Sequence, residues 1–232
     1  MNINCMLDEK NFPHWNGLDF LRYFALPNNQ SLLTGENYLW AYKAAFLVYN
    51  RELIKQYAHE EKIPVLLLAG VAVAEVDGTP ERLKGYGVLQ FRQIVDLFTD
   101  DNRYSNSVSV GAVAIQLRAA AETLGMDPER LTNKQQFDLS NCLLNNDFNL
   151  RVVAKHLRDL ILFDYPDSDT ANLSDEQFIL AGSRYNRGTQ RAKQDFIDSI
   201  HAEKGTHERE YSSYGRRILE KKVTINMIME AY

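Results

Sequence analysis

Features that would assign a function class directly are scarce in this chain of 232 residues. There are two cysteines, Cys5 and Cys142, far apart in the sequence. Such a pair does not form the framework of a disulfide-stabilised secreted domain, so we expect two reduced, partly buried thiols. The five histidines are scattered and show no metal-ligand spacing, which excludes a zinc motif. We therefore expect no metal site and no cofactor.

Long hydrophobic runs and an excess of positive charge are also lacking. The longest apolar stretch, from Val65 to Val76, is too short to cross a membrane. Residues 1–15 lack the basic segment and apolar core of a secretory signal. The formal net charge of -5 disfavours a general nucleic-acid binder. We expect no membrane insertion, no nucleic-acid partner, and synthesis in the cytoplasm without a signal peptide.

What the sequence does contain is helical periodicity. Apolar residues at three- and four-residue spacing predict helices over 37–60 and 149–163. Pro64 suits the first turn of a further helix that runs to about Val76. Helices are also expected from about 111 to 125, from 189 to 202 and near 216–222. Two capping boxes start others, Thr132 with Gln135 and Ser174 with Gln177.

The densest group of helix breakers follows this second helix. Gly78, Pro80, Gly85 and Gly87 fall within residues 77–89, which predicts a loop or a small hairpin there. No segment of the sequence shows sustained alternation of apolar and polar residues. The predicted fold class is therefore mainly α, with at most a small β-hairpin near this loop.

One carboxylate has an unusual position. Glu75 follows a run of apolar and small residues, IPVLLLAGVAVA. At the end of such a helix, desolvation and the helix dipole both favour the protonated carboxyl. A carboxyl that keeps its proton near neutral pH can act as a general acid, which cleavage of a glycosidic bond requires.

Three ordered segments resemble the motifs of one family, the goose-type lysozymes and soluble lytic transglycosylases of the lysozyme-like superfamily. Glu75 followed by GYGVLQ at residues 85–90 resembles the family's Glu and G-x-G-L-M-Q signature. NLRVVAKHLRDL at residues 149–160 resembles its N-I-x-x-G-x-x-Y-L-x-x-L helix. AGSRYNRG at residues 181–188 resembles its A-x-Y-N-x-G motif.

This resemblance implies a lysozyme-like helical fold with a substrate cleft. The catalytic core would span 61–204, with an N-terminal helical extension over 1–60 and a C-terminal helical segment over 205–232. Glu75 would be the catalytic acid. The loop from Tyr86 to Gln90 would form one wall of the cleft, and Gln90 would face the sugar. Tyr185 and Asn186 would reach the site from a later helix end, with Tyr185 near Glu75.

The sequence departs from the family at three positions. Val76 stands where a serine is common, Arg92 where goose-type enzymes have an aspartate, and Arg187 where a small residue is usual. An inverting hydrolase needs a second carboxylate to hold a water, whereas a lytic transglycosylase uses one carboxyl as acid and then base. The candidates for a second carboxylate, which we do not rank, are Asp77, Asp96, Asp100 and Asp101.

The resulting hypothesis is an enzyme that cleaves the β-1,4 bond between N-acetylmuramic acid and N-acetylglucosamine in peptidoglycan. The alternative is a non-catalytic glycan-binding module on the same scaffold, or a helical interaction protein in which Glu75 pairs with Arg82 or Lys84. Without a signal peptide, such an enzyme would reach the periplasm or cell wall through a secretion system or cell lysis. A secreted effector would have a cognate immunity protein.

A local basic cluster accompanies the third motif. Its members are Arg184, Arg187, Arg191 and Lys193. We interpret them as a solvated helix face, because charge runs usually lie at the surface. As part of a peptidoglycan enzyme, they could also meet the carboxylates of peptide stems.

Overall fold

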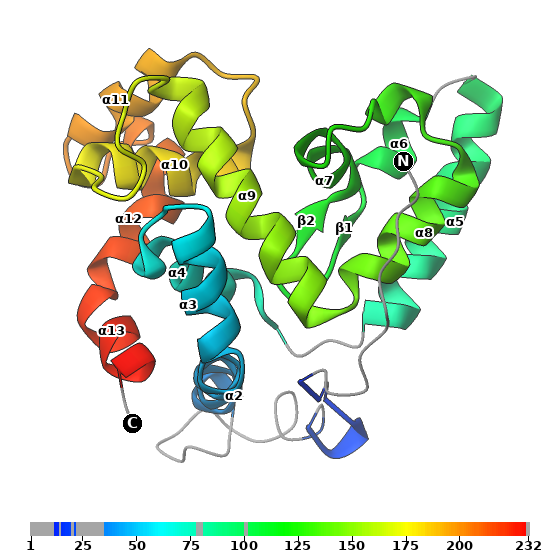
Figure 1. Ribbon diagram of the computed structural model, residues 1–232, viewed down its shortest axis with the longest axis horizontal. Helices are drawn as coiled ribbons and strands as arrows, with labels where there is room; N and C mark the ends of the chain where they lie inside the picture. The colour runs from blue at the N-terminus through cyan, green and yellow to red at the C-terminus, as the bar shows by residue number, and fades with distance from the viewer. Residues whose placement is uncertain are drawn as a thin grey trace. The chain divides into compact units, whose positions relative to one another are not determined.

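The computed structural model describes residues 12–13, 15–19, 21, 35–77, 81–99 and 102–230 (Figure 1). The described chain is mainly helical and carries a small two-stranded antiparallel sheet, which confirms the predicted fold class. It divides into two compact units, and we describe each by itself. The first comprises Met1–Asn50 and Glu75–Val153, and the second Arg51–Ala74 and Ala154–Tyr232. The division into 1–60, 61–204 and 205–232 stays a prediction.

The described part of the first unit consists of helices and one β-hairpin. Its elements are α2 (Gly35–Tyr49), α5 (Glu81–Thr99), α6 (Arg103–Asn106), β1 (Ser109–Val110), β2 (Ile115–Gln116), α7 (Leu117–Thr123), the 3₁₀ turn η1 (Pro128–Arg130), α8 (Asn133–Leu143) and the first part of α9 (Asn146–Asp164). Asp96 of α5 fixes the start of α6, because its carboxylate accepts hydrogen bonds from the backbone N–H groups of Tyr104 and Ser105. The buried Gln136 amide of α8 donates to Ser105 Oγ and Asn106 Oδ1.

The hairpin is tied to the start of α9 by a buried asparagine. β1 and β2 pair in register Ser109 with Gln116 and Val110 with Ile115. Asn149 is fully buried and makes two hydrogen bonds to the turn, accepting from Val113 N at 2.9 Å and donating to Val113 O at 3.1 Å. Gly111 has φ +100°, and a Cβ at that position would overlap the Asn149 amide. The turn therefore requires glycine at 111 and an amide at 149.

Helix α5 corrects the prediction of a loop or hairpin over residues 77–89. Gly85 and Gly87 lie inside this helix, although each costs about 1 kcal/mol relative to alanine. Packing compensates for that cost, since Leu89 is fully buried and Asp96 is hydrogen-bonded to α6. The sheet accordingly lies at 109–116, within the segment that we expected to begin a helix, and α7 begins only at Leu117.

The second unit is helical throughout its described part. Its elements are α3 (Arg51–Glu60), α4 (Val65–Glu75, of which Glu75 belongs to the first unit), the later part of α9, α10 (Asp175–Arg187), α11 (Lys193–His201), η2 (Glu208–Ser212), α12 (Ser213–Glu220) and α13 (Lys222–Glu230). Figure 1 shows α12 beside α10. Their close approach depends on Gly215, where a Cβ would overlap the carbonyl oxygen of Ile179. Gly70 of α4 similarly leaves room for Ile218.

Several local predictions are confirmed. Helix α4 begins directly after Pro64, and both capping boxes are present, at Thr132 before α8 and at Ser174 before α10. Gly125 adopts φ +74° just after α7. The helix predicted over 189–202 is shorter, because α11 starts at Lys193. Among the described helices, none is long and apolar enough to span a membrane.

The prediction of two reduced thiols is wrong for Cys142. This residue lies buried in α8 and is disulfide-bonded. The other cysteine of the sequence, Cys5, lies outside the described residues. Spacing alone did not indicate the bond, because two cysteines far apart in sequence can still meet in the fold.

Candidate active site

Glu75 is the last residue of α4. The interior of this helix is buried from Leu67 to Val73, and Val76 is also buried. Glu75 itself is half-buried, between this apolar segment and the exposed Asp77. The side chain thus has the placement that the sequence predicted, at the C-terminal end of an apolar helix and partly accessible. Its role as an acid stays a prediction, and so does a cleft beside it. The side chains of Arg82 and Lys84 lie outside the described residues.

The segment from Tyr86 to Gln90 does not form the predicted loop. Both residues belong to α5, where Gln90 is exposed and the Tyr86 side chain lies outside the described part. Arg92, two residues after Gln90, donates to Tyr104 O at 3.3 Å and to Ser107 Oγ at 2.5 Å. Arg92 therefore links α5 to the end of α6. Residues 86–90 are therefore helical and do not form a loop, and contact of Tyr86 or Gln90 with a sugar stays a prediction.

The hairpin at 109–116 supplies a glutamine that sequence reasoning missed. Gln116 ends β2, is exposed, and follows Gly111 by five residues. Gly85 and Gln90 have the same spacing, and each glutamine follows a branched apolar residue, Leu89 or Ile115. The sequence thus contains two similar Gly-to-Gln segments, and only the second of them is a hairpin. The two segments differ in backbone conformation, because Gly111 adopts a positive φ. The amino-acid sequence alone does not reveal this difference.

The four candidates for a second carboxylate have different surroundings. Asp96 is buried, and both of its oxygens accept backbone hydrogen bonds at 2.8–3.0 Å, so its role is to cap α6. Asp77 is exposed and lies two residues after Glu75. Asp100 and Asp101 lie outside the described residues. Of the two described candidates, Asp77 is therefore the exposed one.

In the second unit, Tyr185 packs on a histidine of the second motif. The rings of Tyr185, from α10, and His156, from α9, lie 5.9 Å apart in an edge-on arrangement. Burial lowers the pKa of His156 to about 4, so the imidazole is neutral near pH 7. His156 is thus packed against Tyr185. Tyr185 is half-buried, and the next residue, Asn186, is exposed. Gly188, not Asn186, carries the positive φ that ends α10.

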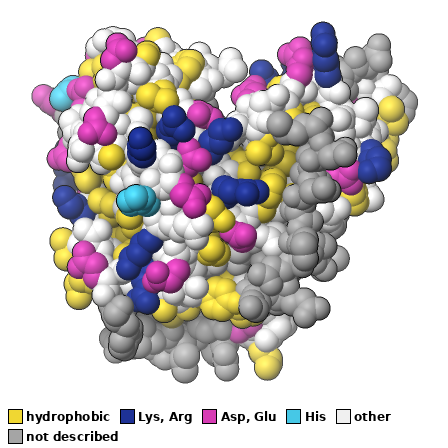
Figure 2. Space-filling model, viewed as in Figure 1, with side chains coloured by type: hydrophobic (Ala, Val, Ile, Leu, Met, Phe, Trp, Pro, Cys, Tyr) yellow, Lys and Arg dark blue, Asp and Glu magenta, His cyan; other side chains and the backbone are white. Residues whose placement is uncertain are grey.

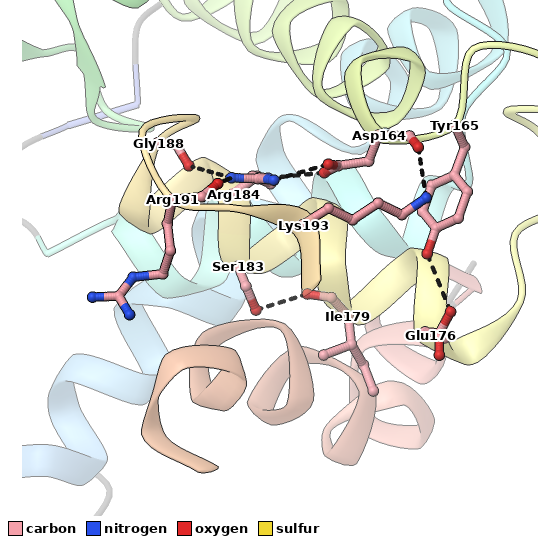
Figure 3. Close-up of polar contacts among 9 residues, drawn as sticks. All are labelled: Asp164, Tyr165, Glu176, Ile179, Ser183, Arg184, Gly188, Arg191 and Lys193. Carbon is pink, nitrogen blue, oxygen red and sulfur yellow. Dashed lines mark hydrogen bonds and ion pairs between the residues drawn. The ribbon is translucent and has the colours of Figure 1, made fainter. Parts of the chain in front are cut away.

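The basic cluster is not a uniformly solvated face, which corrects that interpretation. Arg184 is 1% exposed and makes a two-pronged ion pair with Asp164, with both N···O distances 2.8 Å (Figure 3). Its guanidinium also lies over the Phe196 ring, 4.5 Å from the ring centre. Lys193 Nζ donates to the Asp164 carbonyl at 2.7 Å and lies over the Tyr165 ring. Two members of the cluster are therefore internal anchors, while Arg187 and Arg191 are exposed.

The candidate residues belong to different units. Glu75, Gln90 and Gln116 are in the first unit, and Tyr185 and Asn186 in the second, so the predicted approach of Tyr185 to Glu75 stays a prediction. Within the part of the chain that the structure describes, no cluster of His, Cys, Asp or Glu has the composition of a metal site. No family model matches this chain, and no match was found among curated proteins or solved structures.

Proposed function

We propose that this protein cleaves the β-1,4 bond between N-acetylmuramic acid and N-acetylglucosamine in peptidoglycan, with Glu75 as the general acid. The observation that carries the proposal is the position of Glu75, a half-buried carboxyl at the end of a helix that is buried from Leu67 to Val73. Support also comes from the ordered motifs, because the second and third of them form helices whose residues His156 and Tyr185 are in contact.

The first chemical step needs a proton at the glycosidic oxygen. The Glu75 carboxyl would donate it as the bond breaks and the sugar carbon acquires positive charge. In the unit that contains Glu75, the exposed amide of Gln116 is of the kind that fixes sugar hydroxyls. In the second unit, considered by itself, Asn186 carries an exposed amide and Tyr185 an aromatic face.

The second step separates two mechanisms. In a lytic transglycosylase, the Glu75 carboxylate would take the proton from the substrate's own hydroxyl, whose oxygen then attacks. In an inverting hydrolase, Asp77, Asp100 or Asp101 would have to hold a water, because Asp96 is committed to α6. The transglycosylase forms 1,6-anhydro ends. Mass spectrometry of the products distinguishes these ends from reducing ends.

The test of the proposal is Glu75→Gln, which keeps the side-chain shape and removes the acid. We expect normal folding and a loss of at least about a hundredfold in release of soluble muropeptides, the usual contribution of a general acid. Glu129→Gln, on an exposed side chain, is the matched control and should keep full activity. An active Glu75→Gln protein would refute the assignment. Sacculus binding without any fragment release by the wild type would indicate a non-catalytic binding module instead.

A second comparison decides which glutamine belongs to the site. We expect Gln116→Ala to lower kcat/KM on peptidoglycan by about tenfold, the contribution of one or two hydrogen bonds to the sugar. Gln90→Ala, on the exposed face of α5, should leave kcat/KM unchanged. If Gln90→Ala lowered kcat/KM and Gln116→Ala did not, the sugar site would include α5 and would not include the hairpin.

We infer where the protein acts from its proposed substrate, because the fold does not indicate a location. Peptidoglycan lies outside the cytoplasm, so we propose that the chain acts in the periplasm or cell wall after export through a secretion system or lysis. The disulfide at Cys142 supports this, because disulfides persist in oxidising compartments. A cognate immunity protein that covers Glu75 is the partner that such an effector would need.

A further inference from the structure

Two exposed arginines meet on one aromatic ring in the second unit. The Arg191 guanidinium carbon lies 3.8 Å from the ring centre of Tyr211, and that of Arg187 lies 5.4 Å from it. The His207 ring packs edge-on against the same tyrosine. Cation–π contacts of this kind offset part of the cost of bringing two like charges together. The ring therefore positions two guanidinium groups at the end of α10, next to Asn186.

The backbone that carries Arg191 is fixed from inside. Arg184 Nη1 donates to the carbonyl oxygens of Arg191 at 2.7 Å and Gly188 at 3.4 Å. The same guanidinium is held by Asp164, as Figure 3 shows, while the Arg191 side chain points away from this buried pair. The loop between α10 and α11 thus has a set conformation, and the Arg191 side chain is presented outward.

The tyrosine is fixed by a separate set of contacts. Ser212, the next residue, is fully buried, with its hydroxyl 2.9 Å from Ser199 Oγ and its backbone N–H donating to the same oxygen. Arg187 Nη2 donates to the Glu210 carbonyl at 3.1 Å, which ties the end of α10 to η2. Both cations and the ring between them are therefore preorganised, which lowers the entropic cost of binding a ligand.

Little negative charge opposes these two cations. Asp195 Oδ2 lies 3.9 Å from Arg191 Nη1, and both side chains are more than two-fifths exposed. Within the described part of the chain, no carboxylate oxygen is at ion-pair distance from the Arg187 guanidinium. On the face shown in Figure 2, acidic and basic side chains are interspersed. The pair is thus a small, local concentration of positive charge on a chain with net charge -5.

We propose that Arg187 and Arg191, held on Tyr211, bind a carboxylate of the peptide stem attached to N-acetylmuramic acid. This inference rests on the proposed function and names a further part of its substrate. A guanidinium group matches a carboxylate in a planar, two-pronged geometry, and each stem carries several carboxylates. Asn186 and Tyr185, directly before Arg187, are the residues expected to contact sugar, so a stem leaving that sugar would pass the pair.

The experiment measures binding of the free stem peptide, which does not require cleavage of glycan. The full chain is titrated with a tetrapeptide stem by NMR, and the same peptide with its carboxylates amidated is the negative ligand. Arg191→Gln is the main variant, because the Arg191 side chain donates to no backbone group among the described residues. Arg217→Gln, on an exposed side chain of α12, is the control with the same charge change. Inorganic phosphate serves as competitor.

We expect Arg191→Gln to weaken binding of the stem by about two- to fivefold, the range for one exposed ion pair. Arg191→Lys should lose less, and Arg217→Gln should lose nothing. Equal binding by wild type and Arg191→Gln would overturn the proposal, as would equal affinity for the amidated peptide. Phosphate that displaces the stem at equal concentration would assign a general anion site instead.

Failure of the proposed function is distinguishable from failure of this inference. Glu75→Gln should retain stem binding, and its full retention of cleavage activity would refute only the catalytic role. Conversely, a wild type that cleaves glycan but shows no shift with the stem peptide would refute only the subsite. A further readout is KM, which we expect Arg191→Gln to raise on intact sacculi and leave unchanged on glycan strands freed of peptides.

Discussion

Arg184 and Asp164 form a buried ion pair whose charges are compensated by each other and by hydrogen bonds. The two side chains are 1% and 2% exposed, and the guanidinium also donates through Nη1 to the Gly188 and Arg191 carbonyls. Burying two ions costs several kcal/mol each, which is recovered only when geometry and hydrogen bonding are nearly complete, as they are here. The pair is consequently sensitive to removal of either member.

We predict that Arg184→Met destabilises the chain by about 3–5 kcal/mol, because the Asp164 carboxylate stays buried without its cation. Replacing both, in Arg184→Met with Asp164→Leu, should recover part of that loss but not all, since two loop carbonyls still lack their donor. Urea denaturation monitored by circular dichroism measures the difference. Arg118→Met, in an exposed pair with Glu122, is the control. A single variant as stable as this control would contradict the role of the pair.

Protonation of His156 makes the free energy of unfolding depend on pH. Its pKa is about 4 in the folded chain and near 6.5 when unfolded. Between these values the unfolded chain binds a proton that the folded chain does not, so the free energy of unfolding falls as pH falls from 6.5 to 4. We predict that the stability of wild type relative to His156→Gln drops by up to about 3 kcal/mol between pH 7 and pH 4.

The measurement is urea denaturation of both proteins across that pH range. His59→Gln, on an exposed side chain of α3, controls for general acid effects. A pH-independent difference between wild type and His156→Gln would show that the imidazole is not desolvated. Because His156 contacts Tyr185, loss of activity in parallel with its protonation would further indicate that this ring supports the site.

At the scale of elements, the sequence predicts best where the signal is local. Pro64 and the two capping boxes mark helix starts through backbone groups within three residues, and all three are found as predicted. The error at α5 has the opposite cause. Gly85 and Gly87 are typical of helix breaks, but contacts of α5 with α6 and α8, which are remote in sequence, stabilise this helix. The hairpin at 109–116 likewise depends on Asn149, which is remote in sequence.

The same argument predicts how the hairpin responds to loss of Asn149. In Asn149→Leu, Val113 N–H and C=O lose their partners inside the core, which should cost about 1–3 kcal/mol for each unsatisfied group. We predict faster hydrogen exchange at Val113 and a lower kcat/KM through Gln116. Asn133→Leu, at an exposed position of α8, is the control. Unchanged exchange at Val113 would show that the turn does not depend on this amide.

At the scale of the molecule, sequence motifs in this chain do not coincide with structural units. Helix α4 ends at the unit boundary, so Glu75 belongs with the hairpin and α5, while Tyr185 belongs with α11 and α12. The motif containing Asn149 is also divided, since α9 passes from one unit to the other at Val153. Periodicity indicates that such helices exist. It does not indicate which elements each helix end packs against, because those contacts are made by side chains that are remote in sequence.

The disulfide is the other molecular feature that spacing could not predict. Cys142 is bonded, and within this sequence its only available partner is Cys5. An intramolecular bond between them closes a loop of well over a hundred residues, for which the chain-entropy account gives about 4–5 kcal/mol. We predict that reduction lowers the free energy of unfolding by several kcal/mol, and that Cys142→Ser is equally destabilised and insensitive to reductant.

Thiol titration and mapping of peptides digested without reductant check the bond itself. We expect no free thiol in the native chain and one cross-linked peptide containing residues 5 and 142. Two free thiols after expression in an oxidising compartment would contradict the bond, and a cross-linked dimer would assign it between two chains. If the bond is found, the chain should fold to higher yield in an oxidising compartment than in a reducing one, which is the environment that a peptidoglycan enzyme meets.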